Sequence, residues 1–401
     1  MRRRETRTQR AYDVVLFGAT GFAGELTAAY LAAHAPAEAR WALAGRDQEK
    51  LRRLRDRLAA VDPKLSGLAL LHADSTDPAS LRAIAADTHV VATTVGPYLT
   101  YGEPLVAACA EAGTDYADLT GEPEFVDLMY LRHHALARST GARIVHSCGF
   151  DAIPQDLGVH YTVARLPEGV PLRVEGFVRG SGTISGGTLA SAMTALSRPV
   201  GMVRTAAARR RAEPRPTDRT ISAGPGRLHR RRDLGAWAAP MPTIDPQTVG
   251  RSAAALDRYG PDFRYRAHMV VDRLPVLVGG AAGFGALFAA AQLPPARRWL
   301  SGRLQPGEGP DAERRAKSWF AVRFAGEGGG HRVVTEVSGG DPGYEETAKM
   351  IAESALCLAF DDLPETAGQV TTAAAMGEAL TERLMRAGLV FRTVSPPRPS
   401  P

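Results

Sequence analysis

The strongest constraint on this chain is a glycine-rich turn near its N-terminus. An apolar run, Tyr12–Phe17, leads directly into Gly18-Ala19-Thr20-Gly21-Phe22-Ala23-Gly24, and a helical stretch, Glu25–Ala33, follows. A strand, a glycine turn and a helix in this order form the dinucleotide-binding fingerprint, in which backbone and helix N-terminus meet a pyrophosphate. The alternative is a turn that needs glycine only for its backbone shape. We therefore expect six residues to contact a cofactor: Gly18, Ala19, Thr20, Gly21, Phe22 and Gly24.

The end of the second predicted strand indicates which dinucleotide is bound. Arg40–Ala44 reads as this strand, and Gly45-Arg46-Asp47 follows it. NAD enzymes usually place an acidic residue here for the ribose 2′-hydroxyl, whereas an arginine binds the 2′-phosphate of NADP. Asp47 reads as the N-cap of a helix over Gln48–Ala60, which leaves Arg46 at the strand end. We predict NADP; the alternative is that Arg46 is a solvated loop charge.

Short apolar runs alternate with helical stretches up to residue 148 and predict an α/β fold. The six predicted strands are Val14–Phe17, Trp41–Ala44, Leu68–His72, Val90–Thr94, Tyr116–Leu119 and Arg143–His146. Such alternation gives a doubly wound parallel sheet, a Rossmann domain, which binds ligands at the carboxyl ends of its strands. Besides the glycine turn, this edge carries Arg46, Asp74 near the adenine, Thr94, Val95, Gly96 and Pro97 near the nicotinamide, and Asp118–Glu122.

The length of the chain and its cysteines limit the number of domains and the cellular location that we expect. A chain of 401 residues suits two domains. Three widely separated cysteines, Cys109, Cys148 and Cys357, show neither a disulfide framework nor a zinc spacing, so we expect a reducing, cytoplasmic location and no metal. The basic first ten residues lack the apolar core of a secretory signal and read as a disordered tail.

Positive charge is concentrated between Arg204 and Asp233. Ten arginines stand there against three acidic residues, a net charge of +7, while the whole chain carries +6. Interspersed prolines and glycines predict a mobile basic loop. It reads either as a solvated linker or as a docking surface for an acidic partner. Nucleic acid is the weakest partner, because no aromatic residues are interleaved for base stacking.

The stretch from Leu274 to Ala296 contains no charged residue over 23 positions. Its length suits a membrane span. However, Pro275 and four glycines make it only moderately hydrophobic, and a span would divide the second domain between two compartments. We therefore expect a buried or membrane-surface hairpin, with lipid contact and plain core as the alternatives. Contact with the inner face of the plasma membrane would keep the protein peripheral.

Eight runs along the chain match one known family. They are 18–24, 44–46, 93–98, 116–122, 148–158, 185–191, 259–265 and 373–377. In these runs the chain resembles the saccharopine dehydrogenase-like oxidoreductases, and among them the trans-acting enoyl reductases of polyketide lipid assembly. The resemblance extends from about Tyr12 to about Leu389. It implies an NADP-dependent oxidoreductase that acts on carrier-bound acyl chains in lipid or glycolipid biosynthesis.

The resemblance also implies an order of domains. A Rossmann domain over 11–148 precedes a mixed α/β domain with an antiparallel sheet over 149–343. Helices over 344–390 then return to the first domain, and 391–401 forms a disordered tail. Independently, Glu175–Arg179, Ala321–Ala325 and Arg332–Val337 read as strands, and Tyr344–Phe360 has apolar residues at helical spacing.

Three residues are candidates for the chemistry of an enoyl thioester reduction. Hydride addition at the β-carbon leaves negative charge on the thioester oxygen, and a proton must then reach the α-carbon. Tyr98 could donate to that oxygen, Asp118 could shape the pocket or move protons, and Asp151 lies at the domain crossover. Each has a structural alternative: packing on the nicotinamide, capping a helix, or holding the crossover turn.

Three classes of function remain open from the sequence. The first is a reductase of carrier-bound enoyl chains, with an acidic acyl carrier protein or polyketide synthase as partner and a lipid-like substrate. The second is a saccharopine-type enzyme acting on an imine or amino acid, which should hold a carboxylate with fixed arginines. The third is a lipid-associated protein without catalysis. A homo-oligomer fits any of the three.

Overall fold

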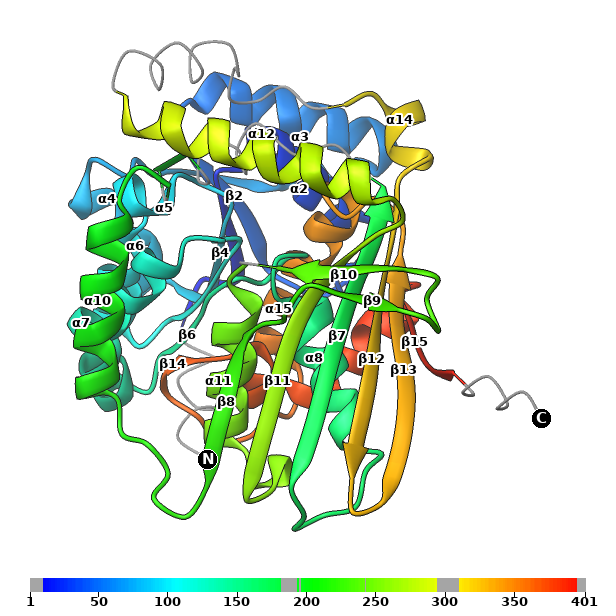
Figure 1. Ribbon diagram of the computed structural model, residues 1–401. Helices are drawn as coiled ribbons and strands as arrows, with labels where there is room; N and C mark the ends of the chain where they lie inside the picture. Colours follow the sequence, from blue (N-terminus) through cyan, green and yellow to red (C-terminus); the bar gives the residue numbers. More distant parts are fainter. Residues whose placement is uncertain (1–9, 182–192, 195, 242, 294–309, 395–401) are drawn as a thin grey trace.

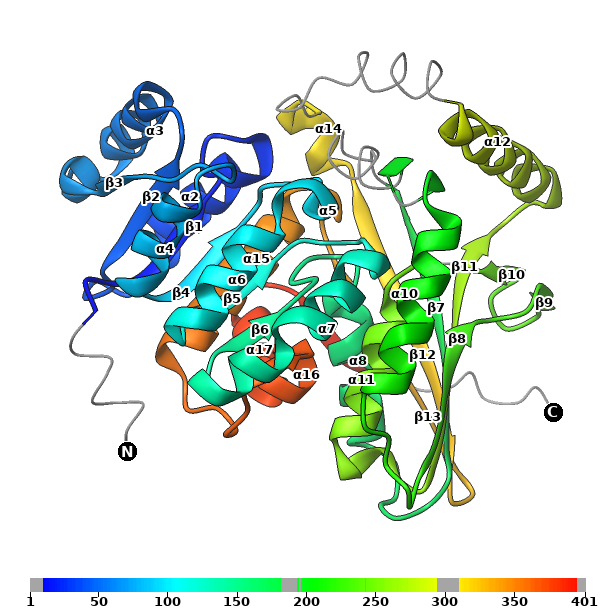
Figure 2. The ribbon, with the colours of Figure 1, turned by 90° about the vertical axis from the view of Figure 1, so that its left-hand side faces the viewer.

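Two β-sheets, with helices between and around them, form the core of the computed structural model (Figure 1). It describes residues 10–181, 193–194, 196–241, 243–293 and 310–394. Figure 2 shows the first sheet and its helices on one side of the molecule and the second sheet on the other. Doubly wound sheets bind ligands in the crevice outside the carboxyl ends of their strands, so a dinucleotide is expected at that edge of the first sheet if the glycine turn acts as predicted.

The first sheet is parallel throughout and has the order β14-β6-β5-β4-β1-β2-β3. Its strands are β1 (Tyr12–Phe17), β2 (Trp41–Gly45), β3 (Ala69–His72), β4 (Thr88–Thr93), β5 (Asp115–Asp118), β6 (Arg143–Val145) and β14 (Gly368–Val370). The strand order reverses between β1 and β4, which is the point where doubly wound sheets bind ligands. The predicted doubly wound α/β fold is therefore confirmed.

Helices cover both faces of this sheet. From the N-terminal part of the chain come α2 (Phe22–His34), α3 (Gln48–Val61), α4 (Pro78–Ala86), α5 (Tyr98–Tyr101), α6 (Glu103–Ala112) and α7 (Pro123–Thr140), with a short 3-10 turn over Pro63–Gly67. From the C-terminal part, α15 (Glu345–Phe360) packs against α2, β1 and β4. Twelve of its residues are buried, including every residue from Met350 to Ala359, because the helix packs against the neighbouring α2 as well as the sheet.

The second sheet is mixed and has the order β15-β13-β12-β7-β11-β10-β9, with β8 paired to β11. Its strands are β7 (Leu172–Ser181), β8 (Thr220–Pro225), β9 (His229–Arg231), β10 (Ala236–Pro240), β11 (Asp262–Val271), β12 (Trp319–Gly328), β13 (His331–Gly339) and β15 (Val390–Val394). The β11 strand runs parallel to β7 and β8, while β12 pairs antiparallel with both β7 and β13. The antiparallel pairing that the sequence analysis expects is therefore found between β12 and its two neighbours, whereas β11 pairs in parallel with β7 and β8.

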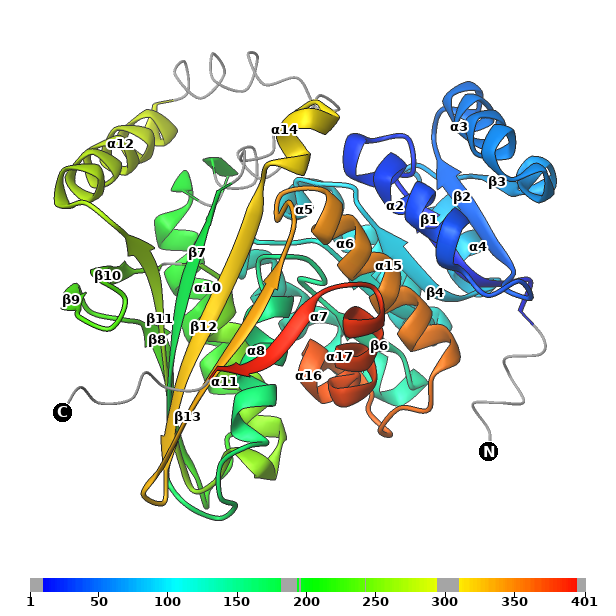
Figure 3. The same cartoon turned by 90° about the vertical axis from the view of Figure 1, so that its right-hand side faces the viewer.

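Further helices fill the space between the two sheets (Figure 3). They are α8 (Ile153–Val163), α11 (Asp245–Ala255), α16 (Thr372–Ala375) and α17 (Gly377–Arg386), with a 3-10 turn over Asp257–Tyr259. Close packing requires glycine at Gly158 of α8, where a Cβ would lie 2.3 Å from the ring of Phe324. The inner face of the second sheet is thereby held tightly against the helices that connect it to the first.

The arginine-rich segment is not the mobile loop that the sequence predicts. It contains most of α10 (Pro199–Ala212), which packs against α7, and also β8 and β9. Arg209 is only 2% exposed: it bonds Glu213 at 2.7 Å, lies 3.4 Å from Asp127 and stacks on the ring of Tyr130. Partners distant in sequence neutralise part of the charge, so the segment folds.

Two other expectations also need correction. The predicted tails 1–10 and 391–401 lie mostly outside the described residues, but Arg10 bonds the carbonyl of Ala112 at 2.5 Å and 391–394 belongs to β15. The apolar stretch forms one continuous helix, α12 (Leu274–Gln292), followed after residue 309 by the short α14 (Ala312–Ala316). Over its described part it is neither a hairpin nor buried, and only 6% of its most apolar window is covered.

Candidate active site

Two of the three glycines in the turn are required by the fold itself. Gly18 has a φ of +86°, and a Cβ there would lie 2.6 Å from Cγ2 of Val95. A Cβ at Gly24 would lie 2.1 Å from the carbonyl oxygen of Gly18, so only glycine lets α2 approach β1 this closely. Ala19 between them is fully buried. These residues shape the turn.

Gly21 differs from the other two because the fold does not require it. It is the N-cap of α2 with a φ of −81°, a conformation that any residue adopts. A Cβ there would meet nothing nearer than the Gly18 carbonyl oxygen at 3.5 Å. Gly21 and Thr20 are both partly exposed in front of the helix N-terminus. An open cradle before the N–H groups of a helix start fits the pyrophosphate of a dinucleotide.

Arg46 stands free at the carboxyl end of β2. Its side chain is exposed, and it makes no hydrogen bond or ion pair with the described residues. Asp47 caps α3 by accepting a hydrogen bond from the Lys50 N–H at 3.0 Å, as predicted. Asp74 follows β3; hydrogen bonds from Thr76 and then the charge of Arg46 lower its pKa. An unpartnered guanidinium at this edge fits the 2′-phosphate of NADP.

The loop after β4 lies beside the glycine turn. The Thr94 N–H donates to the Phe17 carbonyl, and the Thr94 hydroxyl donates to the Gly18 carbonyl, each at 3.1 Å. Val95, Gly96 and Pro97 continue this loop and are partly or fully exposed. The loops that follow β1 and β4 are thus joined at the switch point, as the nicotinamide half of the crevice requires. Phe22, in contrast, packs edge-on against Tyr344, 4.7 Å between ring centres, rather than into the crevice.

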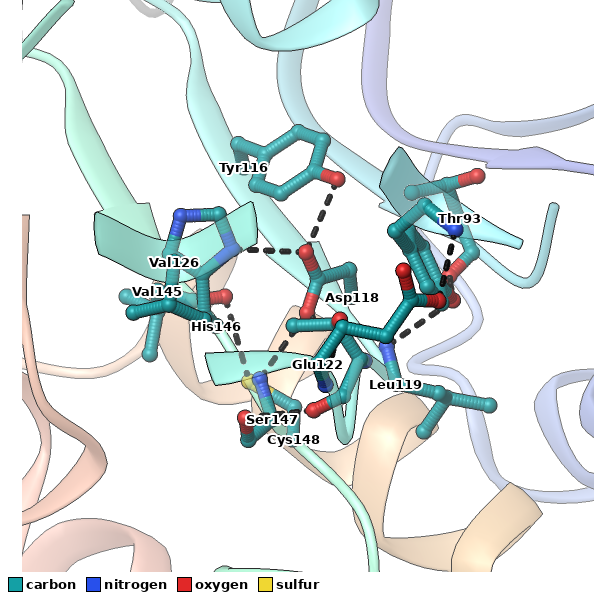
Figure 4. Close-up of polar contacts among 12 residues, drawn as sticks. Thr93, Tyr116, Asp118, Leu119, Glu122, Val126, Val145, His146, Ser147 and Cys148 are labelled. Atoms are coloured by element: carbon teal, nitrogen blue, oxygen red, sulfur yellow. Dashed lines mark hydrogen bonds and ion pairs between the residues drawn. The ribbon is translucent and has the colours of Figure 1, made fainter. Parts of the chain in front are cut away.

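Asp118 is held in a network of hydrogen bonds at the ends of β5 and β6 (Figure 4). Its fully buried carboxylate accepts hydrogen bonds from the Tyr116 hydroxyl at 2.9 Å and the Ser147 N–H at 2.9 Å, and pairs with Nδ1 of His146 at 2.6 Å. The Thr120 N–H donates to it as well, at 3.0 Å. With four partners and no exposed atom, Asp118 fixes the ends of β5 and β6 instead of touching a substrate.

Tyr98 is also occupied within the framework. It is 4% exposed; its hydroxyl donates to the Thr93 carbonyl and accepts from the Leu119 N–H, each at 3.1 Å. The Glu122 carboxylate accepts hydrogen bonds from the N–H groups of Tyr98 and Leu99, both at 2.9 Å. Burial raises the pKa of Tyr98 well above its usual value. The expectation that Tyr98 donates to a thioester oxygen is therefore not supported; it positions the β4 loop.

Asp151 is the one predicted catalytic residue whose carboxyl group remains available. It lies at the crossover into α8, against Gly121, where a Cβ would meet its Oδ2 at 2.8 Å. Gly121 follows β5 at the carboxyl edge of the first sheet. No residue in the described ranges donates a hydrogen bond to Asp151. Burial raises the pKa of Asp151 to about 6, which makes it an acid of suitable strength near neutral pH.

A second carboxyl group, which sequence reasoning missed, interacts with Asp151. Asp245 begins α11, is fully buried, and accepts hydrogen bonds from the Tyr265 hydroxyl at 3.0 Å and from Thr243. Burial and, to a smaller degree, the charge of Asp151 raise its pKa to about 7. The only local signal was an acidic residue before Pro246 at a helix start, which reads as an ordinary N-terminal acid.

The parallel sheet, the glycine turn and the free arginine together define a Rossmann-type dinucleotide-binding protein. Residues 14–145 match the saccharopine dehydrogenase NADP-binding domain. This match and the 38–39% identity to curated relatives over nearly the whole chain show that the chain belongs to the saccharopine dehydrogenase-like family of NADP-dependent oxidoreductases. The family, the NADP cofactor and the enzyme class predicted from the sequence are thereby confirmed.

Curated relatives match almost the whole chain. A trans-acting enoyl reductase of Mycobacterium tuberculosis H37Rv is 39% identical over 426 residues, covering 96% of this chain and 98% of the relative. A trans-acting enoyl reductase of Mycobacterium ulcerans is 38% identical over 418 residues, covering 95% and 97%. Among solved structures, apo saccharopine dehydrogenase (L-Glu forming) of Saccharomyces cerevisiae has a TM-score of 0.54 at 13% identity, covering 95% of this chain and 99% of the other. That last likeness concerns the fold alone.

Proposed function

We propose that the protein reduces the α,β-double bond of an unsaturated acyl thioester in lipid or glycolipid biosynthesis, the acyl chain being carried by a polyketide synthase or acyl carrier protein. The description of the relatives that match nearly the full length supports this reaction. NADPH, when bound, supplies the hydride that reaches the β-carbon. The chain itself must bind the cofactor, orient the thioester and provide the proton at the α-carbon.

Cofactor binding is assigned to the residues that surround the switch point. The start of α2 and the cradle at Gly21 hold the pyrophosphate, while Arg46 binds the 2′-phosphate. The loop from Thr94 to Pro97 borders the nicotinamide. Asp74 lies at the end of β3, on the adenine side, where its carboxylate closes a turn with Thr76 at 2.8 Å.

The observation that carries the proposal is the available acid at Asp151. A carboxyl group with a pKa of about 6, at the carboxyl edge of the sheet and without an internal donor among the described residues, can deliver a proton to the α-carbon. Asp245, with a pKa of about 7, keeps a second proton within electrostatic reach. A saccharopine-type enzyme would instead need arginines fixed in the crevice for a substrate carboxylate. Residues 185–191, one of the runs in which the sequence resembles the family, lie outside the described residues.

We assign binding of the carrier partner to the exposed arginines of α10. Arg204, Arg210 and Arg211 are exposed and make no ion pair with the described residues. The start of this helix is tied to the crevice edge, because the guanidinium of Arg198 bonds the Glu124 carboxylate at 2.9 Å, at the beginning of α7. A basic helix that leads to the crevice would attract an acidic carrier and raise the rate of encounter.

The test is NADPH oxidation with an enoyl thioester presented on a carrier protein and on pantetheine. Asp151→Asn should lower kcat by about 10²-fold or more, the contribution usual for a general acid, while leaving the Kd of NADPH unchanged. Asp56→Asn, an exposed change on α3, is the matched control. NADPH binding without oxidation of any enoyl thioester would refute the reductase and favour a non-catalytic protein. Turnover of an imine instead would favour the saccharopine type.

A further inference from the structure

The helix α12 is unusual because it is apolar and uncovered. No charged residue occurs between Leu274 and Gln292, yet only 6% of its most apolar 18-residue window is buried. A core helix of similar composition would be covered by its own protein. The exposed large side chains on this helix are Leu274, Val276, Val278, Phe284 and Phe288.

These side chains do not share one face. Leu274, Val278, Phe284 and Phe288 fall within about 120° of one another around the helix axis, whereas Val276, 62% exposed, points to the opposite side. A protein partner, including a second copy of this chain, would cover one stripe and leave the other side in water. Only a surrounding apolar medium covers both sides, and the acyl region of a lipid bilayer is such a medium.

The sheet topology excludes a helix that crosses the membrane. The chain enters α12 from β11 and later forms β12, and both strands pair directly with β7. A single crossing would place β11 and β12 on opposite sides of the bilayer, which their common neighbour forbids. The helix must therefore enter and leave from the same side. This corrects the alternative of a transmembrane span that the sequence left open.

Charges near the helix indicate what kind of bilayer it meets. Arg273, exposed at its N-cap, directly precedes it, and Arg297 and Arg298 follow it in the sequence. Arginines at both ends of an apolar segment are attracted to anionic lipid headgroups. We propose that α12 seats the protein on an anionic membrane surface, embedded in one leaflet parallel to the plane.

Because of where α12 lies, seating this helix on a membrane also affects how a substrate would reach the protein. Figures 1 and 2 show α12 at the same end of the molecule as α2 and α14. At that end the Arg315 guanidinium of α14 lies 5.6 Å from the centre of the Phe22 ring, at the start of α2 beside the glycine turn. The start of α2, next to the glycine turn, thus lies at the end of the molecule that carries α12. The benefit for a long acyl substrate rests on the proposed function; the seating does not.

The test is cosedimentation of the full-length protein with vesicles in the absence of substrate. With vesicles of phosphatidylcholine and phosphatidylglycerol we expect most of the protein in the pellet, and less with phosphatidylcholine alone. The double variant Val276→Glu, Phe284→Glu should reduce the bound fraction about tenfold or more, because charges at the acyl boundary are costly. Val61→Glu changes a valine that is even more exposed, 87% on α3, and should bind as the wild type does.

Two further measurements separate the outcomes. An unchanged Kd for NADPH shows that the double variant remains folded, whether or not the reductase proposal holds. Wild-type protein that stays in the supernatant with anionic vesicles overturns the seating, as does equal binding by the wild type and the double variant. A dimer in size-exclusion chromatography that the double variant breaks, without vesicle binding, assigns the helix to a second copy and also overturns it.

Discussion

Asp151 and Asp245 come from different elements, the crossover before α8 and the start of α11, yet the charge of Asp151 acts on the Asp245 carboxyl group. Burial raises the pKa of Asp151 to about 6, and burial followed by the charge of Asp151 raises that of Asp245 to about 7. Two carboxyl groups held near each other in surroundings of low polarity do not both ionise readily. The pair therefore retains a proton at a pH where isolated aspartates have lost theirs.

The pH dependence of reduction should follow from this pair. Asp151 donates only in its protonated form, and that form is lost as the pH rises through about 6. We expect kcat/KM with a carrier-bound enoyl substrate to fall above this pH, by about tenfold per pH unit once the acid is mostly ionised. Asp151→Asn should remove this limb from the profile, and Asp56→Asn should retain it. A wild-type profile flat between pH 5 and 8 would argue against a carboxylic acid as donor.

Cofactor preference should depend on Arg46. Arg46→Ala removes the free guanidinium at the end of β2, so NADPH affinity should fall by about 1–3 kcal/mol, while NADH affinity should hardly change. Fluorescence titration of both nucleotides measures the difference. Arg82→Ala, an exposed arginine on α4, is the control. Equal affinity of the wild type for the two nucleotides would place the 2′-phosphate elsewhere.

Substitutions at two glycines of the turn should have different effects, one on NADPH binding and the other on the stability of the fold. Gly21→Val introduces a branched side chain into open space before α2, so the Tm should stay within a few degrees while NADPH binding is lost. Gly24→Ala places a methyl group 2.1 Å from the Gly18 carbonyl oxygen and should lower the Tm itself. Thermal unfolding with and without NADPH compares them. A Gly21→Val protein that binds NADPH normally would show that the pyrophosphate does not lie at this turn.

Substitution of the exposed arginines of α10 should affect activity with the carrier-bound substrate, whereas substitution of the buried Arg209 should affect stability. Changing Arg204, Arg210 and Arg211 to glutamine should lower kcat/KM for the carrier-bound substrate about tenfold at low salt, with little change for the pantetheine thioester. This loss should shrink in 1 M salt, where the Debye length is about 3 Å. Arg209→Gln should instead reduce stability, by about 3–5 kcal/mol for a broken buried pair. An equal loss on both substrates for the triple variant would argue against carrier docking.

The sequence predicts most of what local patterns determine. Tyr12–Phe17 and the glycine turn form a strand, a turn and a helix start because apolar periodicity and backbone freedom are properties of neighbouring residues. The sequence also predicts the place of Arg46 directly after β2, because the position follows from the end of the neighbouring strand.

What the sequence could not predict depends on partners distant along the chain. From the sequence alone, Arg209 belongs to a run of charged residues that is expected to be solvated. In the structure it is buried beside Asp127 and Tyr130 of α7. Tyr98 reads as an available donor because nothing in the sequence places the Leu119 N–H against its hydroxyl. Asp245 reads as a helix N-terminal acid, since its coupling to Asp151 arises only when α11 packs against α8.

The strands β14 and β15, which come last among the described residues, have a consequence for how the protein folds during synthesis. The β14 strand adds to the edge of the first sheet beside β6, and β15 adds to the edge of the second beside β13. Neither sheet has all of its described strands until residues 368–394 have left the ribosome. The N-terminal domain therefore cannot finish folding during its own synthesis, and its open β6 edge is exposed to other chains until β14 arrives.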